Sequence, residues 1–333
     1  MLPESKTDFP KCLYLDQNKW IDLARAHYGK PDGAKFQQCL DSIRSGVTLG
    51  KLIVPFSVVN AIESMISRDA GRRQRLAEFM VELSGNKSIS PEHVVASLEI
   101  DNAVRQLFGL PALESPRGSV VRAGIVHAIG MEAEIHEILR PPFADAFVTH
   151  MNSAAATVDF LRGLGNNRES IQRARDGEAQ AQVIFQSDRE VTDTMSRADR
   201  LRVELYGLFG KNADYRIALK ATLRSIGRTV DEFKSTLGAD DILASFITAV
   251  PNFDIFVSLR MLRDLDRDRQ VEHNDIRDLD WLSVTVPYSN IVVSEHYWGK
   301  KVVQHGLAAK FDTVLLTNLL ELPAHLSAMG CDT

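Results

Sequence analysis

The chain has 333 residues, a net charge of −5 at pH 7, 25% charged residues and 44% hydrophobic residues, as in ordinary folded proteins. No run approaches the roughly 18 to 20 apolar residues that cross a bilayer, and no basic segment followed by an apolar stretch opens the chain, so we expect a cytoplasmic protein without a membrane span. The negative charge argues against a protein that coats nucleic acid by bulk attraction, although a local basic groove can coexist with an acidic pocket.

The cysteines support neither a disulfide framework nor a zinc site. Cys12, Cys39 and Cys331 lie far apart, are odd in number and lack CxxC spacing. We therefore expect three reduced thiols.

The first sixty residues predict an alternating α/β unit. KCLYLD at 11–16 is a short apolar strand, and the apolar spacing of 18–29 predicts a helix. A second helix is predicted over 34–46, and the β-branched residues of 51–57 predict another strand. Ser57 is placed to cap the helix that follows. Strands separated by helices indicate a parallel sheet.

Between 71 and 265 strand signals nearly vanish and helical ones repeat. Ser90-Pro91 is typical of a helix start, and Thr229 with Glu232 fits a capping box. We therefore expect this middle stretch to be all helical.

The α/β pattern resumes in the last part of the chain. A helix is predicted over 276–286, a strand over 290–295, a helix over 296–310 and a strand over 311–318. The strands at the two ends would belong to one sheet.

The expected organisation is one interrupted domain. Segments 10–70 and 266–330 would form an α/β domain with a parallel sheet flanked by helices, and 71–265 would be a large all-helical insertion. The insertion would form a substrate wall, a lid or an interface between copies of the chain.

Acidic residues stand where such a sheet would bring them together. Asp16 and Glu295 end two of the strands, and Glu63 lies early in the helix after the second strand. Asp278 and Asp280 begin the helix that leads to the strand of Glu295. Ligands of open parallel sheets bind outside the carboxyl ends of the strands, and carboxylates that meet there repel unless a hard cation such as Mg²⁺ or Mn²⁺ binds them. Singly each residue is more often a helix cap or solvated, so it is their joint placement that favours a metal site for phosphodiester hydrolysis.

Three segments resemble parts of a PIN-like domain, a family of metal-dependent nucleases. They are LYLDQNKWIDLA at 13–24, LIVPFSVVNAIE at 52–63 and RDLDWLSVTVPYSNIVVSEHYW at 277–298. The resemblance covers the two ends of the chain and none of the middle. Glu295 stands where aspartate is commoner, and Asn290 stands where many relatives are acidic.

The resemblance implies a PIN-like fold and an Mg²⁺- or Mn²⁺-dependent ribonuclease that uses a metal-activated water on single-stranded or structured RNA. Many PIN-like proteins are toxin-like or defence nucleases, so such a role is part of the expectation. Its acidic, metal-binding residues would be Asp16, Glu63, Asp280 and Glu295, with Asp278 as the alternative third member. Candidate substrate-binding residues are Asn18, Arg72, Arg73, Ser294, Lys300 and Lys301.

Two other interpretations stay open. A catalytically silent PIN-like module would bind a protein or nucleic-acid partner and show no effect of divalent cations on its melting temperature. Arg122 and His127 have the R-x4-H spacing of HEPN ribonucleases, which cleave without metal, although Ala123 replaces the polar residue that usually follows the arginine. His273 is a further candidate ligand, although a loop histidine is more often solvated.

Overall fold

The computed structural model describes residues 10–65, 69–113, 115–164, 168–192, 194–272 and 275–332. Contacts within the chain form two compact units, which we call the sheet unit and the helical unit. The sheet unit comprises 10–91, 119–175 and 285–332, and the helical unit comprises 92–118 and 176–284.

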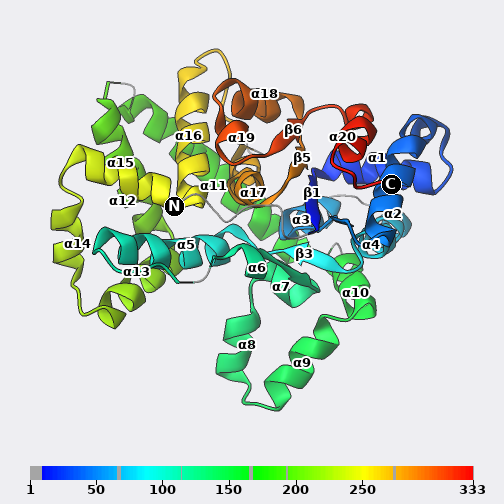
Figure 1. Cartoon of the computed structure of the whole chain (residues 1–333), viewed down its shortest axis with the longest axis horizontal. Coiled ribbons are helices and arrows are strands. Elements are labelled where there is room, and N and C mark those ends of the chain that lie inside the picture. The colour runs from blue at the N-terminus through cyan, green and yellow to red at the C-terminus, as the bar shows by residue number, and fades with distance from the viewer. Residues whose placement is uncertain are drawn as a thin grey trace. The chain divides into compact units, whose positions relative to one another are not determined.

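A four-stranded parallel sheet forms the centre of the sheet unit (Figure 1). Its strands are β1 (Lys11–Leu15), β2 (Leu52–Ile53), β5 (Ile291–Val293) and β6 (Val314–Leu316). The order is β2-β1-β5-β6, with β1 and β5 paired in parallel register. The prediction that strands from both ends of the chain share one parallel sheet is confirmed.

Helices flank this sheet. They are α1 (Gln17–His27), α2 (Gln37–Thr48), α3 (Val58–Met65), α4 (Ala70–Ser84), α10 (Ala154–Leu164), α18 (His296–Gln304), α19 (Leu307–Lys310) and α20 (Leu322–Ala328). Alternation along β1 directs Leu13 and Leu15 into a core shared with Trp20 of α1 and Phe79 of α4. Ser57 Oγ accepts a hydrogen bond of 3.2 Å from the Asn60 amide, as the predicted helix cap requires.

Two strands lie in the stretch expected to be all helical, so that expectation was wrong there. β3 (Lys87–Ile89) pairs antiparallel with β4 (Val121–Ala123), and Phe56 bridges in parallel to Ser88. Each strand has three residues, too few for an alternating pattern to stand out, and only the hydrogen bonds to distant segments define it.

The division of the chain also differs from the three expected segments. Leu76, Phe79, Ile125 and Leu161 join the apolar core under the sheet, so 71–91 and 119–175 belong to the sheet unit. Within the second of these segments, α7 (Ile125–Ile129), α8 (Glu132–Ile138) and α9 (Phe143–Met151) precede α10.

The described residues of the helical unit contain helices and no strand. These are α5 (Glu92–Leu107), α12 (Arg197–Lys211), α13 (Ala213–Ser225), α14 (Val230–Thr236), α15 (Asp240–Ala249) and α16 (Pro251–Leu265). The unit boundaries fall inside α6 (Arg117–Val120), α11 (Arg168–Thr192) and α17 (Asp275–Tyr288). The predicted capping box of Thr229 and Glu232 begins α14.

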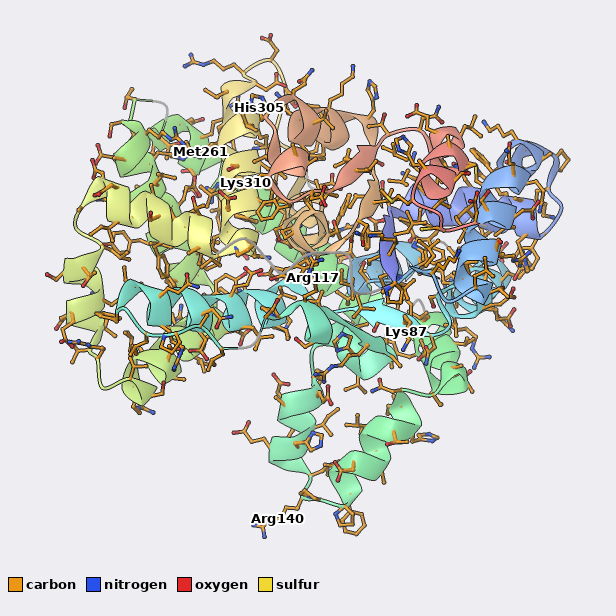
Figure 2. All side chains as sticks on the ribbon, viewed as in Figure 1. Lys87, Arg117, Arg140, Met261, His305 and Lys310 are labelled. Carbon is orange, nitrogen blue, oxygen red and sulfur yellow. The ribbon has the colours of Figure 1, made fainter. Side chains whose placement is uncertain are left out.

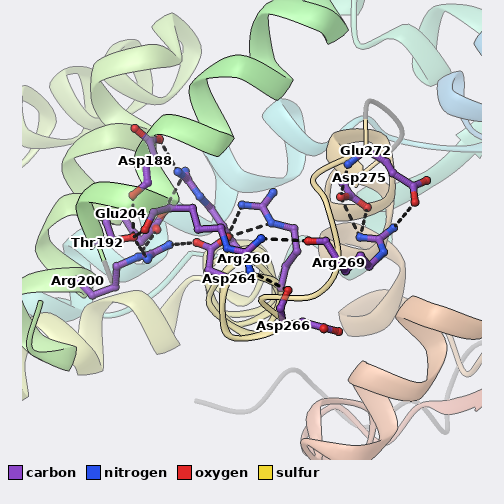
Figure 3. A network of polar contacts seen from close by, with 12 residues as sticks. Asp188, Thr192, Arg200, Glu204, Arg260, Asp264, Asp266, Arg269, Glu272 and Asp275 are labelled. Atoms are coloured by element: carbon purple, nitrogen blue, oxygen red, sulfur yellow. Dashed lines mark hydrogen bonds and ion pairs between the residues drawn. The ribbon is translucent and has the colours of Figure 1, made fainter. Parts of the chain in front are cut away.

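The helical unit encloses an apolar core and a buried polar network. Phe209, Phe233 and Phe253 pack edge to face in the core. Arginine and carboxylate side chains of α11, α12 and α16 form the network, which Figure 3 shows from close by.

Cys12, Cys39 and Cys331 are buried and lie outside any disulfide, as expected. In the part of the chain that the structure describes, no single helix is both long and apolar enough to cross a bilayer, and only α15 and α16 taken together, with a bend of 111° between them, reach that length and composition.

Gly33→Ala is expected to destabilise the sheet unit. Gly33 lies in the 3₁₀ helix η1 (Pro31–Phe36), where a Cβ atom would lie 2.3 Å from the carbonyl carbon of Arg25 and 2.4 Å from the amide nitrogen of Ala26. Because both atoms are backbone, the segments must separate, and we expect a loss of about 1–3 kcal/mol in the free energy of unfolding.

Urea denaturation measures this loss, with Gly163→Ala in α10 as the control. A Cβ at Gly163 meets no atom within 4 Å, so that change should be neutral or stabilise by up to about 1 kcal/mol. Equal denaturation midpoints for the two variants would contradict the close approach of η1 to α1.

Candidate active site

Asp16 lies between β1 and α1, at the carboxyl end of the sheet. It is the N-cap of α1, and its Oδ1 accepts a hydrogen bond of 2.6 Å from the Gln17 amide. Only 6% of the residue is exposed, and its Oδ2 is buried without a hydrogen-bond partner among the described residues. A buried carboxylate oxygen normally accepts a hydrogen bond, so we expect Asp16 Oδ2 to bind a ligand or to carry a proton.

Glu295 follows the adjacent strand β5 at the same edge. The two strand ends are joined by a hydrogen bond of 3.0 Å from the Asp16 amide to the Val293 carbonyl. Glu295 is exposed, and Asn18 Nδ2 donates to its Oε1 at 2.7 Å. The structure therefore brings together three residues predicted for the site, and Asn18 holds one of its carboxylates.

The two carboxylates interact electrostatically. Burial and the negative charge of Glu295 raise the pKa of Asp16 from its ordinary value of 3.8 to about 6, against the opposing effects of the Gln17 amide and Lys19. Lys19 lies in the first turn of α1, and its Nζ is 3.4 Å from the Thr317 carbonyl oxygen that follows β6. We call Asp16, Asn18, Lys19 and Glu295 the carboxyl-edge site.

Glu63 lies on α3, which borders this site. Gln17 Nε2 donates to Ser64 Oγ at 2.8 Å, which holds the end of α3 beside the start of α1. Burial raises the pKa of Tyr14 well above its usual range, and the charges of Asp16 and Glu63 raise it further. Asp16 and Glu63 therefore both lie near the Tyr14 hydroxyl.

Ser294 is enclosed behind the edge. Its side chain is fully buried, and its Oγ donates to the Glu295 carbonyl at 3.1 Å. A Cβ atom at Gly299 would lie 2.6 Å from Ser294 Oγ and 2.5 Å from Thr317 Cγ2, so glycine allows α18 to pack closely there. Ser294 is thus placed to orient the backbone of Glu295.

Asp278 and Asp280 belong to the part of α17 that lies in the helical unit. Trp281 Nε1 donates to Asp278 Oδ1 at 3.1 Å. Burial, followed by the charges of Glu92 and Asp278, raises the pKa of Asp280 well above its usual range. Glu92 itself accepts a hydrogen bond from the Tyr215 hydroxyl. In this unit Asp280 is therefore close to a second carboxyl group, which sequence reasoning did not find.

The predicted substrate-binding cations have different surroundings. Arg73 is buried, whereas Arg72 is exposed and lines a pocket in the sheet unit. Lys300 is exposed, and Lys301 Nζ lies 5.4 Å from the centre of the Tyr297 ring. Of these residues, Arg72 and Lys300 present their charge most openly.

Asn290 lies at the other end of β5 from Glu295. Its Oδ1 accepts a hydrogen bond of 2.9 Å from the Cys12 amide, and the residue is 8% exposed. Asn290 therefore lies outside the carboxyl-edge site.

The R-x4-H pair does not lie on one helix. Arg122 is on β4 and forms an exposed ion pair of 3.6 Å with Glu132. His127 is buried on α7, with its Nε2 3.0 Å from Ser90 Oγ, and burial lowers its pKa. His273 lies outside the described residues.

The raised pKa of Asp16 predicts a pH-dependent difference between metal-free wild type and Asp16→Asn. The pKa of Asp16 is 3.8 in the unfolded chain and about 6 in the folded protein. At pH values between these two, the folded wild type keeps a proton that the unfolded chain has released. Wild type should therefore lose stability relative to the variant as the pH rises from about 4 to about 6, by up to about 3 kcal/mol. Urea denaturation of both proteins in EDTA across this range measures the difference, and a constant difference would contradict the burial of an unpaired Asp16 carboxylate.

Within the described ranges, no group of three or more histidine, cysteine, aspartate or glutamate side chains is close enough together to hold a metal ion. No protein-family model matches the chain, and neither a curated protein nor a solved structure matches it.

Proposed function

We propose that the carboxyl-edge site is the active site of a PIN-like nuclease that hydrolyses RNA with Mg²⁺ or Mn²⁺. The observation that carries the proposal is the buried Asp16 carboxylate, which has an unpaired oxygen and a second carboxylate, Glu295, at the neighbouring strand end. The position of both residues at the carboxyl edge of a parallel sheet supports it, since ligands of such sheets bind there.

The residues present fit a hard divalent cation. Mg²⁺ keeps several waters and commonly takes one or two carboxylates together with substrate oxygens, so Asp16 and Glu295 are sufficient protein ligands. When bound, the cation would supply an activated water and offset the charge that develops on the phosphodiester. Glu63, whose charge acts on Tyr14 together with that of Asp16, is a third carboxylate of the set that the resemblance implies.

The side chains around the carboxylates position and balance them. Asn18 restrains the Glu295 carboxylate, and the N-cap hydrogen bond restrains that of Asp16. Lys19 places a positive charge near Asp16, where it can also offset the charge of a scissile phosphate. These contacts preorganise the site, as catalysis by charge stabilisation requires.

Metal binding and cleavage test the proposal together. Wild type freed of metal by EDTA should melt at a higher temperature after Mg²⁺ or Mn²⁺ is added, with a stabilisation of about 2.7 kcal/mol at about 100 times the Kd. Labelled single-stranded RNA, structured RNA and single-stranded DNA should be cut only with metal present, and their comparison identifies the preferred substrate.

The other outcomes identify other functions. If divalent cations do not change the melting temperature and none of the substrates is cut, the silent PIN-like module would be favoured. Cleavage that persists in EDTA and is lost in Arg122→Ala would favour the HEPN-like ribonuclease.

A further inference from the structure

A basic pocket lies in the sheet unit between α1, η1 and α4, apart from the four residues of the carboxyl-edge site. Its volume is about 270 Å³. Four of its lining residues are cationic, namely Arg25, Lys30, Arg72 and Arg75, whereas Asp32 is its one acidic residue. The residues that line the pocket therefore carry more positive than negative charge, although the whole chain carries a net charge of −5.

Three of these four cations are available to a ligand. Arg25 is neutralised by Asp22 at 3.0 Å and Asp32 at 3.2 Å. No ion pair joins Lys30, Arg72 or Arg75 to any residue that the structure describes. They form an excess of positive charge at the pocket, which favours an anion.

An acidic residue close to the arginines, Asp69, caps a helix. Asp69 is the N-cap of α4 and accepts a hydrogen bond of 3.0 Å from the Arg72 amide. This hydrogen bond and the charges of Arg75 and Arg72 lower the pKa of Asp69. Arg72 and Arg75 lie three residues apart on one helix, so they share a face and can hold one phosphate group between them.

The rest of the pocket is apolar and aromatic. Ile21, Ala24 and Leu76 line it, together with the Tyr28 ring. The Tyr28 hydroxyl donates to the Arg75 carbonyl at 2.9 Å, which fixes the ring beside the arginines, and 36% of the residue is exposed. An exposed, fixed aromatic ring is a surface on which a nucleobase can stack.

We propose that this pocket binds a nucleoside phosphate, with the phosphate held by Lys30, Arg72 and Arg75 and the base placed against Tyr28 and the apolar lining. A volume of about 270 Å³ lies near the lower end of small-molecule sites, about 300–1,000 Å³, and suits one nucleotide rather than several. The nucleotide is either a free molecule or one unit of an RNA strand. The second possibility rests on the proposed function.

Titration of the full chain in EDTA tests the pocket without any cleavage. The probes are AMP and UMP, with adenosine and inorganic phosphate as partial ligands and a 5′-phosphorylated RNA pentamer as the strand. The nucleotides should bind at least about tenfold more tightly than either partial ligand, because each partial ligand contacts only one half of the pocket. The double variant Arg72→Gln/Arg75→Gln should weaken them at least about tenfold.

Arg140→Gln is the matched control, since Figure 2 shows Arg140 at the tip of the hairpin of α8 and α9, away from α1 and α4. It should bind the nucleotides as wild type does. Arg72 and Arg75 are exposed, so their replacement should leave the melting temperature unchanged.

The outcomes separate the two sources. If the mononucleotides bind as tightly as the pentamer, the ligand of the pocket is a free nucleotide. If the pentamer binds much more tightly, the pocket is a subsite for RNA. Failure of wild type to bind nucleotides, equal affinity for inorganic phosphate, or unchanged affinity in the double variant would overturn the proposal. Because the titration is made without metal, its result is independent of whether the carboxyl-edge site cleaves RNA.

Discussion

Asp16→Asn is expected to remove metal-dependent cleavage of RNA, with kcat/KM lower by more than about 100-fold. Loss of a residue that only supports a metal ligand can already lower activity by about 100-fold. The amide oxygen of asparagine can still accept the hydrogen bond from the Gln17 amide, so α1 should begin as before. The variant loses the negative charge and the unpaired oxygen that a cation needs. The loss should therefore be one of chemistry rather than of folding.

Three measurements separate these effects. The increase in melting temperature caused by Mn²⁺ should disappear in Asp16→Asn, whereas its melting temperature in EDTA near neutral pH should equal or exceed that of wild type, because the buried charge is gone. Asp159→Asn, an exposed carboxylate of α10 paired with Arg162, should cleave as wild type does. Wild-type cleavage by Asp16→Asn with an unchanged metal effect would contradict the proposed active site.

Glu204→Gln is expected to destabilise the helical unit by about 3–5 kcal/mol, because it removes a negative charge that compensates two buried guanidinium groups. Glu204 is 1% exposed, and its carboxylate lies 2.6 Å from Arg200 Nε and 3.0 Å from Arg260 Nη1. Asp264 and Asp188 pair with the same arginines (Figure 3). Breaking such a network from one side leaves charges that water cannot reach.

Urea denaturation followed by circular dichroism measures the effect, and Asp240→Asn is its control. Asp240 pairs with Arg202 on the surface, with 64% of its side chain exposed, so its loss should change the free energy of unfolding by less than about 1 kcal/mol. Similar small effects of both substitutions would show that the buried network contributes little to stability.

The sequence by itself predicted the elements whose signals are local. A run of apolar residues ending at Asp16 and the helical spacing after it predicted β1 and α1, and Ser57 and Thr229 marked helix starts that the structure has. The side-by-side placement of strands from the two ends followed from the same patterns, because strands separated by helices form parallel sheets. Asp16 and Glu295 could be expected at one edge for that reason.

Only the tertiary structure decided the contacts between distant segments. β3 and β4 are three residues long and exist because they pair with each other, which no local pattern encodes. Glu92 lies near Asp280, and Arg72 shares a pocket with Lys30, because the packing of separate segments brings them together. Local propensity and periodicity act over a few residues, whereas pairing, burial and pKa depend on which surfaces the folded chain brings into contact, and that choice is made by the whole fold.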